Sequence, residues 1–229
     1  MIMKKILFSD KYSLTQAVLD GRKTMTRRVC KYDRPDETYD IVFPVFEPND
    51  YDNDGNIVSP LNYAFGWKND KGDFTGWNIP KYKVGEVVSI AQSYMDVDRF
   101  HRKGKNAAYL EYLDSILPEL KLYPGWGNKM FVKADLMPHH IRITDIKIER
   151  LQDISDEDCL KEGIGKYFIG FDSPHTDYMG FTYSFDESGK YKYPNAKQAF
   201  ASLIDKVSGK GTWSSNPYVF VYEFELLVD

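Results

Sequence analysis

Tyr218-Val219-Phe220-Val221-Tyr222-Glu223-Phe224-Glu225-Leu226, close to the end of the chain, is a run of β-branched and aromatic residues. These residues favour extended backbone because their side chains pack well on a pleated surface. Their density in this segment predicts a strand in the interior of a sheet.

A second long strand is expected after Pro138, where isoleucines alternate with polar residues in the way that a strand with one buried face requires. The alternation slips near Asp145, which predicts a β-bulge at that position. Shorter strands are expected at residues 3–8, 41–43, 62–65 and 87–91.

Helices are expected at residues 14–20, 107–117, 155–162 and 195–207. Ser13-Leu14-Thr15-Gln16 has the pattern of a capping box, and Gly21 would end that helix in a left-handed conformation. Ser155 and Asn195 are of the residue types that cap helix N-termini. Few helices, several strands that look antiparallel and long loops together predict an α+β fold, a small mixed or antiparallel β-barrel with short helices packed at its ends.

The chain of 229 residues is long enough to bury a large core, and we expect one domain over residues 1–229. Segments dense in Asp, Asn, Gly and aromatic residues predict insertions at about 31–83, 95–128 and 164–194. Their aromatic residues could stack on bases; the candidates are Trp67, Trp77, Tyr94, Trp126 and Trp213.

No apolar run is long enough for a membrane span, and the apolar start of the chain is too short for a signal peptide. We therefore expect a cytoplasmic protein without a membrane partner. Cys30 and Cys159 form neither a disulfide framework nor a metal-binding spacing. The segment 50–55 resembles the start of a calcium loop, but Leu61 stands where a bidentate glutamate is needed. The sequence thus predicts no metal and no cofactor.

The octapeptide Gly21-Arg22-Lys23-Thr24-Met25-Thr26-Arg27-Arg28 carries four cations and two hydroxyls. Residues 1–30 contain seven cations and two anions, a net charge of +5, whereas the whole chain has -4, which leaves -9 for the rest. Such a local reversal of sign is typical of a site for an anionic ligand, phosphate above all. The alternative is a solvated basic turn.

Glu162 lies in the last turn of the helix predicted over residues 155–162, beside the negative end of the helix dipole. A carboxylate there costs up to about 1 kcal/mol, although the neighbouring Lys161 could reduce that cost. The residue is therefore either an ordinary surface side chain or one that is kept for a function.

Gly21, Lys23, Thr26 and Arg28 form the pattern G-x-K-x-x-T-x-R, which resembles the signature of ASCH domains, relatives of the RNA-binding PUA domain. Further segments follow in the order found in the longer, phage-type members of that family. They are residues 84–88, 137–155, 162–164 and 216–224. The three predicted insertions lie outside the resemblance.

The resemblance implies a PUA-like barrel with a cleft for a nucleoside, a nucleotide or single-stranded RNA. Some compact relatives hydrolyse N4-acetylcytidine to cytidine and acetate with a lysine, a threonine and a glutamate, which correspond here to Lys23, Thr26 and Glu162. The expected substrate-binding residues are Arg28, Gly21, Arg27, Gln92 and Tyr94. Where phage-type relatives usually carry an Arg-Glu pair, this chain has Ala91-Gln92-Ser93-Tyr94, so its pocket differs in polarity.

Two assignments of the chemistry remain open. Either a neutral Lys23 deprotonates Thr26 as the nucleophile while Glu162 handles the leaving group, or Glu162 activates water while Lys23 and Thr26 stabilise the oxyanion. The alternative functions are a non-catalytic RNA-binding or nucleotide-binding module and a ribonuclease that uses the same cleft.

Overall fold

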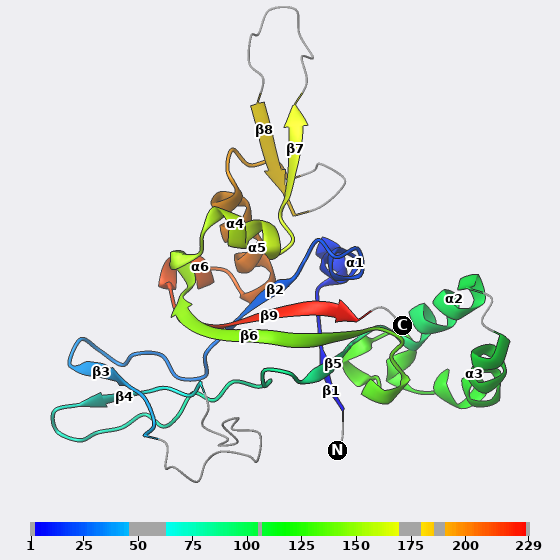
Figure 1. The fold of residues 1–229 in the computed structure, drawn as a ribbon, viewed down its shortest axis with the longest axis horizontal. Helices are drawn as coiled ribbons and strands as arrows, with labels where there is room; N and C mark the ends of the chain where they lie inside the picture. Colours follow the sequence, from blue (N-terminus) through cyan, green and yellow to red (C-terminus); the bar gives the residue numbers. More distant parts are fainter. Residues whose placement is uncertain (1–2, 46–62, 105–106, 170–179, 186–190, 228–229) are drawn as a thin grey trace, which may run out of the picture.

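A five-stranded sheet lies at the centre of the molecule, with the strand order β1-β5-β6-β9-β2 (Figure 1). The computed structural model describes residues 3–45, 63–104, 107–169, 180–185 and 191–227. β1 is parallel to β5, and the other neighbours in the sheet are antiparallel. The strands are β1 (Lys4–Ile6), β2 (Met25–Val29), β5 (Val87–Ile90), β6 (His140–Arg150) and β9 (Tyr218–Leu227).

The two long strands of the sheet, β6 and β9, pair along almost their whole lengths, from His140 opposite Leu227 to Arg150 opposite Tyr218. Their register shifts between Ile143 and Asp145, so the predicted β-bulge is confirmed. β9 has a partner on each side, which confirms its predicted place in the interior of the sheet. β2, which the sequence did not predict as a strand, pairs with the outer side of β9.

The helices and helical turns complete an α+β structure, as predicted. The α-helices are α1 (Leu14–Leu19), α2 (Tyr94–Gly104), α3 (Ala107–Leu120), α4 (Asp156–Lys161), α5 (Ala196–Ser208) and α6 (Thr212–Ser215). The 3-10 turns are η1 (Asp10–Tyr12), η2 (Pro124–Trp126), η3 (Lys129–Phe131), η4 (Ala134–Leu136) and η5 (Leu151–Asp153). Within the described ranges, no helix combines the length and the apolar character that a membrane span needs.

A closed barrel is not seen in the described part of the chain. β1 and β2 are the two edges of the sheet, and no strand pairing joins them there. β1 is only three residues long and leaves the sheet before Leu7. A side chain links the edges instead, since Arg28 Nη2 donates to the Leu7 carbonyl at 2.7 Å.

Most of the buried apolar side chains belong to one cluster, in which the sheet packs against α1, α4 and α5. The α5 residues Phe200 and Leu203 and the β9 residues Val219 and Val221 are among its members. A second, smaller cluster lies beside α2 and α3 and contains Tyr94.

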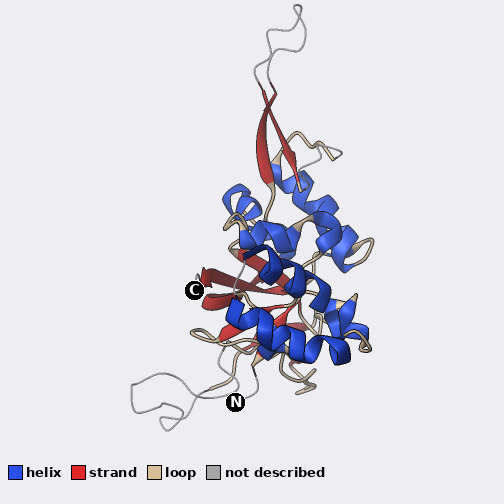
Figure 2. Cartoon of the chain, turned by 90° about the vertical axis from the view of Figure 1, so that its right-hand side faces the viewer, coloured by secondary structure: helices blue, strands red, loops and turns tan. Residues whose placement is uncertain are grey.

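The predicted insertions hold the elements farthest from the sheet. The first carries a hairpin of β3 (Tyr39–Val42) and β4 (Gly66–Asn69), and the second carries α2 and α3, of which α2 was not predicted. In the third, β7 (Gly165–Ile169) and β8 (Gly180–Ser184) form a hairpin that projects away from the sheet (Figures 1 and 2). The segment that resembles a calcium loop, residues 50–61, lies outside the described residues.

Two of the three predicted N-caps are formed. The side chain of Ser155 accepts from Asp158 N at 3.0 Å, and that of Asn195 accepts from Gln198 N at 2.8 Å. The predicted capping box at Ser13 is wrong, because Ser13 ends the preceding turn η1 in a left-handed conformation with φ of 54°. Its side chain therefore makes no cap hydrogen bond.

This difference predicts unequal effects of two serine substitutions. Ser155→Ala removes a cap and should lower the free energy of unfolding by about 1 kcal/mol. Ser13→Ala, the matched control, removes no cap and should change it by well under half of that. Urea denaturation measures both values, and an equal loss for the two variants would contradict the capping assignment.

Candidate active site

A lysine and a glutamate that lie far apart in the chain form a buried ion pair beside β2. Lys23 Nζ is 2.6 Å from Glu162 Oε2, and the two residues are 2% and 4% exposed. Lys23 also donates to the carbonyls of Met25, at 2.7 Å, and of Glu162, at 2.8 Å. These three acceptors match the three protons of an ammonium group, so the contacts favour a protonated Lys23.

Backbone hydrogen bonds hold the Lys23 segment between two helices. Gly21 follows α1 with φ of 72°, as its predicted left-handed conformation requires. Lys23 N then donates to Ala17 O of α1 at 2.8 Å, and Thr24 N donates to Lys161 O of α4 at 2.9 Å. The basic octapeptide is therefore fixed at both helix ends before it enters β2.

Glu162 reaches Lys23 because α4 ends at this point. Glu162 is the C-cap of α4, and Gly163 follows with φ of 98°. This positive φ is one that L side chains rarely adopt, so the turn after α4 favours a glycine; a Cβ atom there would stand at an ordinary contact distance of 3.5 Å from side-chain atoms of Ala17 and Lys23. The Lys23 ammonium also supplies the cation that the negative end of the α4 dipole favours, which offsets the cost predicted for Glu162.

Arg27 connects the ion pair to a larger buried network. Its Nη1 is 3.2 Å from Glu162 Oε1, so the Glu162 carboxylate lies between two cations. Its Nη2 is 2.6 Å from Glu149 Oε1 and 2.9 Å from Asp158 Oδ2. Burial alone would lower the pKa of Arg27, but these carboxylates raise it above its ordinary value. Arg27 is thus a permanent cation that fixes the orientation of Glu162.

The burial of Lys23 changes its acidity. Desolvation lowers its pKa from the ordinary value, and the charge and hydrogen bond of Glu162 oppose this effect without cancelling it. The ammonium of Lys23 therefore gives up a proton more readily than that of a lysine in water. This property suits a residue that must pass a proton to a leaving group.

The three residues predicted to be catalytic line one small cavity. Lys23, Thr26 and Glu162 meet around a space of about 80 Å³ next to Arg27 and Arg28. Thr26 is 5% exposed and is paired with Tyr222 in the sheet, so its position is set by β2 and β9. The sequence resemblance thus selected residues that the fold brings together.

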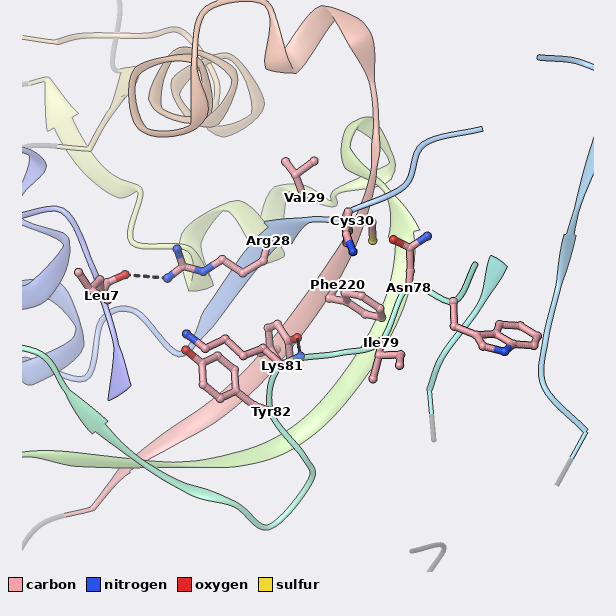
Figure 3. Close-up of a pocket in the computed structure, with 12 residues that line it drawn as sticks. Leu7, Arg28, Val29, Cys30, Asn78, Ile79, Lys81, Tyr82 and Phe220 are labelled. Atoms are coloured by element: carbon pink, nitrogen blue, oxygen red, sulfur yellow. Dashed lines mark hydrogen bonds between the residues drawn. The ribbon is translucent and has the colours of Figure 1, made fainter. Parts of the chain in front are cut away.

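A larger cavity, of about 480 Å³, adjoins the small one and shares Leu7 and Arg28 with it (Figure 3). Its walls come from β2, from β9 and from the segment 77–82 at the end of the first insertion. The principal lining residues are Arg28, Trp77, Lys81, Tyr82, Phe220 and Tyr222.

Only some of the residues predicted to bind substrate line one of the two cavities. Arg28 lines both cavities, and Arg27 lines the small one. Gly21 shapes the turn before β2 and lines neither cavity. Gln92 and Tyr94 also line neither cavity, because the chain turns into α2 at this point. Tyr94 is buried in the second cluster, where its hydroxyl accepts from Lys133 N at 2.8 Å.

Sequence reasoning missed several residues of this region. Glu149 and Asp158 orient Arg27, and Lys81 and Tyr82 line the larger cavity. Of the aromatic residues considered for stacking, Trp77 lines that cavity, whereas Trp67 is 2% exposed in the main core. The segment 77–82 has no motif that could have identified it, since it is brought to the cavity by tertiary structure alone.

Within the described residues, no group of three or more His, Cys, Asp and Glu side chains is placed to hold a metal ion. A scan against protein-family models finds none that matches the chain. Searches of curated proteins and of solved structures give no match either.

Replacing Glu162 by glutamine should lower the pKa of Lys23 further, because the carboxylate is the main group that raises it. The titration of the Lys23 side chain can be followed by NMR on lysine-labelled protein. Glu149→Gln is the matched control, since Glu149 contacts Arg27 rather than Lys23, and it should leave the Lys23 midpoint almost unchanged. A midpoint that stays constant or rises in Glu162→Gln would contradict the assignment.

Proposed function

We propose that this protein is an amidohydrolase that removes the acyl group from an N4-acylated, cytidine-like nucleoside or nucleotide. The observation that supports this function is the meeting of Lys23, Thr26 and Glu162 at one small cavity, with the amine and the carboxylate 2.6 Å apart. Proton transfer needs groups within hydrogen-bond reach, and this pair meets that requirement. The same three residues correspond to the catalytic set that the resemblance to ASCH hydrolases implies.

The contacts argue against a neutral Lys23, as in the first of the two assignments left open by the sequence, and favour Glu162 as the group that activates water, as in the second. We modify the second assignment in one respect, because we give Lys23 the role of the acid and leave the oxyanion to Thr26. An ammonium with three acceptors cannot act as a base, so Lys23 is the acid of the reaction. Glu162 accepts a proton from the water that attacks the acyl carbon, and the Thr26 hydroxyl stabilises the developing oxyanion. The carbon–nitrogen bond then breaks as Lys23 donates its proton to the leaving amine.

The ion pair also explains how the enzyme would return to its starting state. After one reaction Glu162 carries the proton taken from water, and Lys23 has lost one to the amine. Transfer across the 2.6 Å contact restores both residues. Water and the acylated amine are consumed, and a carboxylic acid and the free amine leave.

The sizes of the two cavities fit the two parts of the proposed substrate, the acyl group and the nucleoside. A space of about 80 Å³ accommodates a small acyl group, whereas the adjoining 480 Å³ lies in the range of small-molecule sites and can hold a nucleoside. We further propose that the sheet is an open variant of the PUA-like fold of ASCH domains, and that the protein acts in the cytoplasm. Glu162 also has a structural role as the partner of Lys23 and Arg27, and we favour catalysis over a module that only binds RNA because the same carboxylate lines the cavity together with Lys23 and Thr26.

Thr26→Val keeps the shape of the side chain and removes the hydroxyl, so it should lower kcat/KM for N4-acetylcytidine by at least about 100-fold. Thr26→Ser keeps the hydroxyl and should retain activity within about 10-fold. Release of cytidine, followed by chromatography, measures both. Matched thermal unfolding of the two variants excludes a folding defect.

Absence of cytidine release by the wild-type protein would overturn the proposed hydrolase. In that case, binding of short single-stranded RNA that weakens with salt would identify the alternative, a binding module.

A further inference from the structure

The larger cavity has a cationic lining without acidic residues. Among the described residues around it are Arg28, Lys31 and Lys81, and no aspartate or glutamate, although the chain as a whole has a net charge of -4. Within the described part of the chain, none of these three cations takes part in an ion pair. An anion is the ligand that such a lining favours.

Arg28 and Lys81 lie on opposite walls and extend toward the same end of the cavity, where Tyr82 also lies (Figure 3). Burial and the nearby charges of Arg28, Lys4 and Lys5 lower the pKa of Lys81, and Glu86 opposes them too weakly to cancel the effect. Lys81 is therefore close enough to Arg28 for the two charges to repel each other, and Glu86 compensates this repulsion only in part.

The wall that carries Lys81 is fixed to the sheet. Lys81 N donates to the Tyr222 hydroxyl at 2.8 Å, and the Tyr82 hydroxyl donates to Lys5 O at 3.0 Å. The rings of Tyr82 and Tyr222 are in edge contact with their centroids 5.2 Å apart. The position of Lys81 is thus built into the fold, and Trp77 from the same segment adds an aromatic surface.

We propose that this cavity binds the phosphate ester of a nucleotide substrate through Arg28 and Lys81, so that a phosphorylated substrate is preferred over the free nucleoside. The inference rests on the proposed function, because it concerns the part of the substrate that extends away from the reacting acyl group. Thr26 and Arg28 are two residues apart on β2, which places them about 7 Å apart on one face of the strand. One nucleotide can span that separation.

The first experiment compares kcat/KM for N4-acetylcytidine and for its 5′-monophosphate. We expect the monophosphate to be preferred by about 10- to 100-fold, the range given by hydrogen bonds to a charged group. In Lys81→Gln this preference should fall by about 10-fold. Lys83→Gln makes the same change of charge at an exposed residue that does not line the cavity, and it should keep the preference.

Two results would overturn the phosphate site. One is equal kcat/KM for the two substrates in the wild-type protein, and the other is an equal loss of preference in Lys81→Gln and Lys83→Gln. The second result would show that only the overall charge matters.

A binding experiment separates this inference from the proposed hydrolase. Calorimetry on Thr26→Val with cytidine and with cytidine 5′-monophosphate needs no turnover, and the monophosphate should bind at least 10-fold more tightly. If the monophosphate binds more tightly than cytidine and the wild-type protein shows no hydrolysis, the proposed hydrolase activity is overturned and the phosphate site is supported. Equal binding would overturn the phosphate site even if hydrolysis is observed. A short RNA that contains one cytidine, tested beside the monophosphate, identifies whether a phosphodiester or a phosphomonoester is preferred.

Discussion

The buried contact between Lys23 and Glu162 is the constraint on which the arrangement of this site depends. Taking two charges out of water is costly, and the cost is recovered only when the ions are paired and their remaining hydrogen bonds are satisfied. Here Lys23 has an acceptor for each of its protons, and Glu162 has a cation at each oxygen. The end of α1, the start of β2 and the end of α4 must therefore meet at one place.

Strand β2 gives two neighbouring arginines different tasks. Successive side chains on a strand point to opposite faces, so Arg27 and Arg28 leave β2 in different directions, although both line the small cavity. Arg27 has a fully buried side chain and is bound by three carboxylates, which makes it part of the framework. Arg28 is exposed, lines both cavities and donates to the Leu7 carbonyl. The first arginine fixes Glu162, and the second lines the cavity that we propose for the ligand.

The three insertions differ in how they relate to the site. The first ends in the segment 77–82, which supplies one wall of the larger cavity. In the second, α2 and α3 pack around a hydrophobic cluster of their own, and in the third the β7–β8 hairpin projects away from the sheet. Among the described residues of the three insertions, only those of the first therefore line either cavity. Residues 77–82 thus form part of the larger cavity, whereas Lys23, Thr26 and Glu162 lie outside the three insertions.

The sequence by itself determined what depends on local preference. The long strands β6 and β9, the bulge near Asp145, the caps at Ser155 and Asn195 and the turn at Gly21 follow from periodicity and from backbone conformation. Ser13 is a different case: the adjacent turn η1 ends at this residue, and its left-handed conformation prevents the capping box that the residue types suggested. Tertiary structure alone decided that β2 is a strand and that Lys81 reaches the cavity, because the deciding contacts come from residues distant in the chain, β9 for β2 and Tyr222 for Lys81. Local propensity carries no information about such partners. The residues of the site could therefore be identified from the sequence motif, but the shape of the cavities could not be predicted.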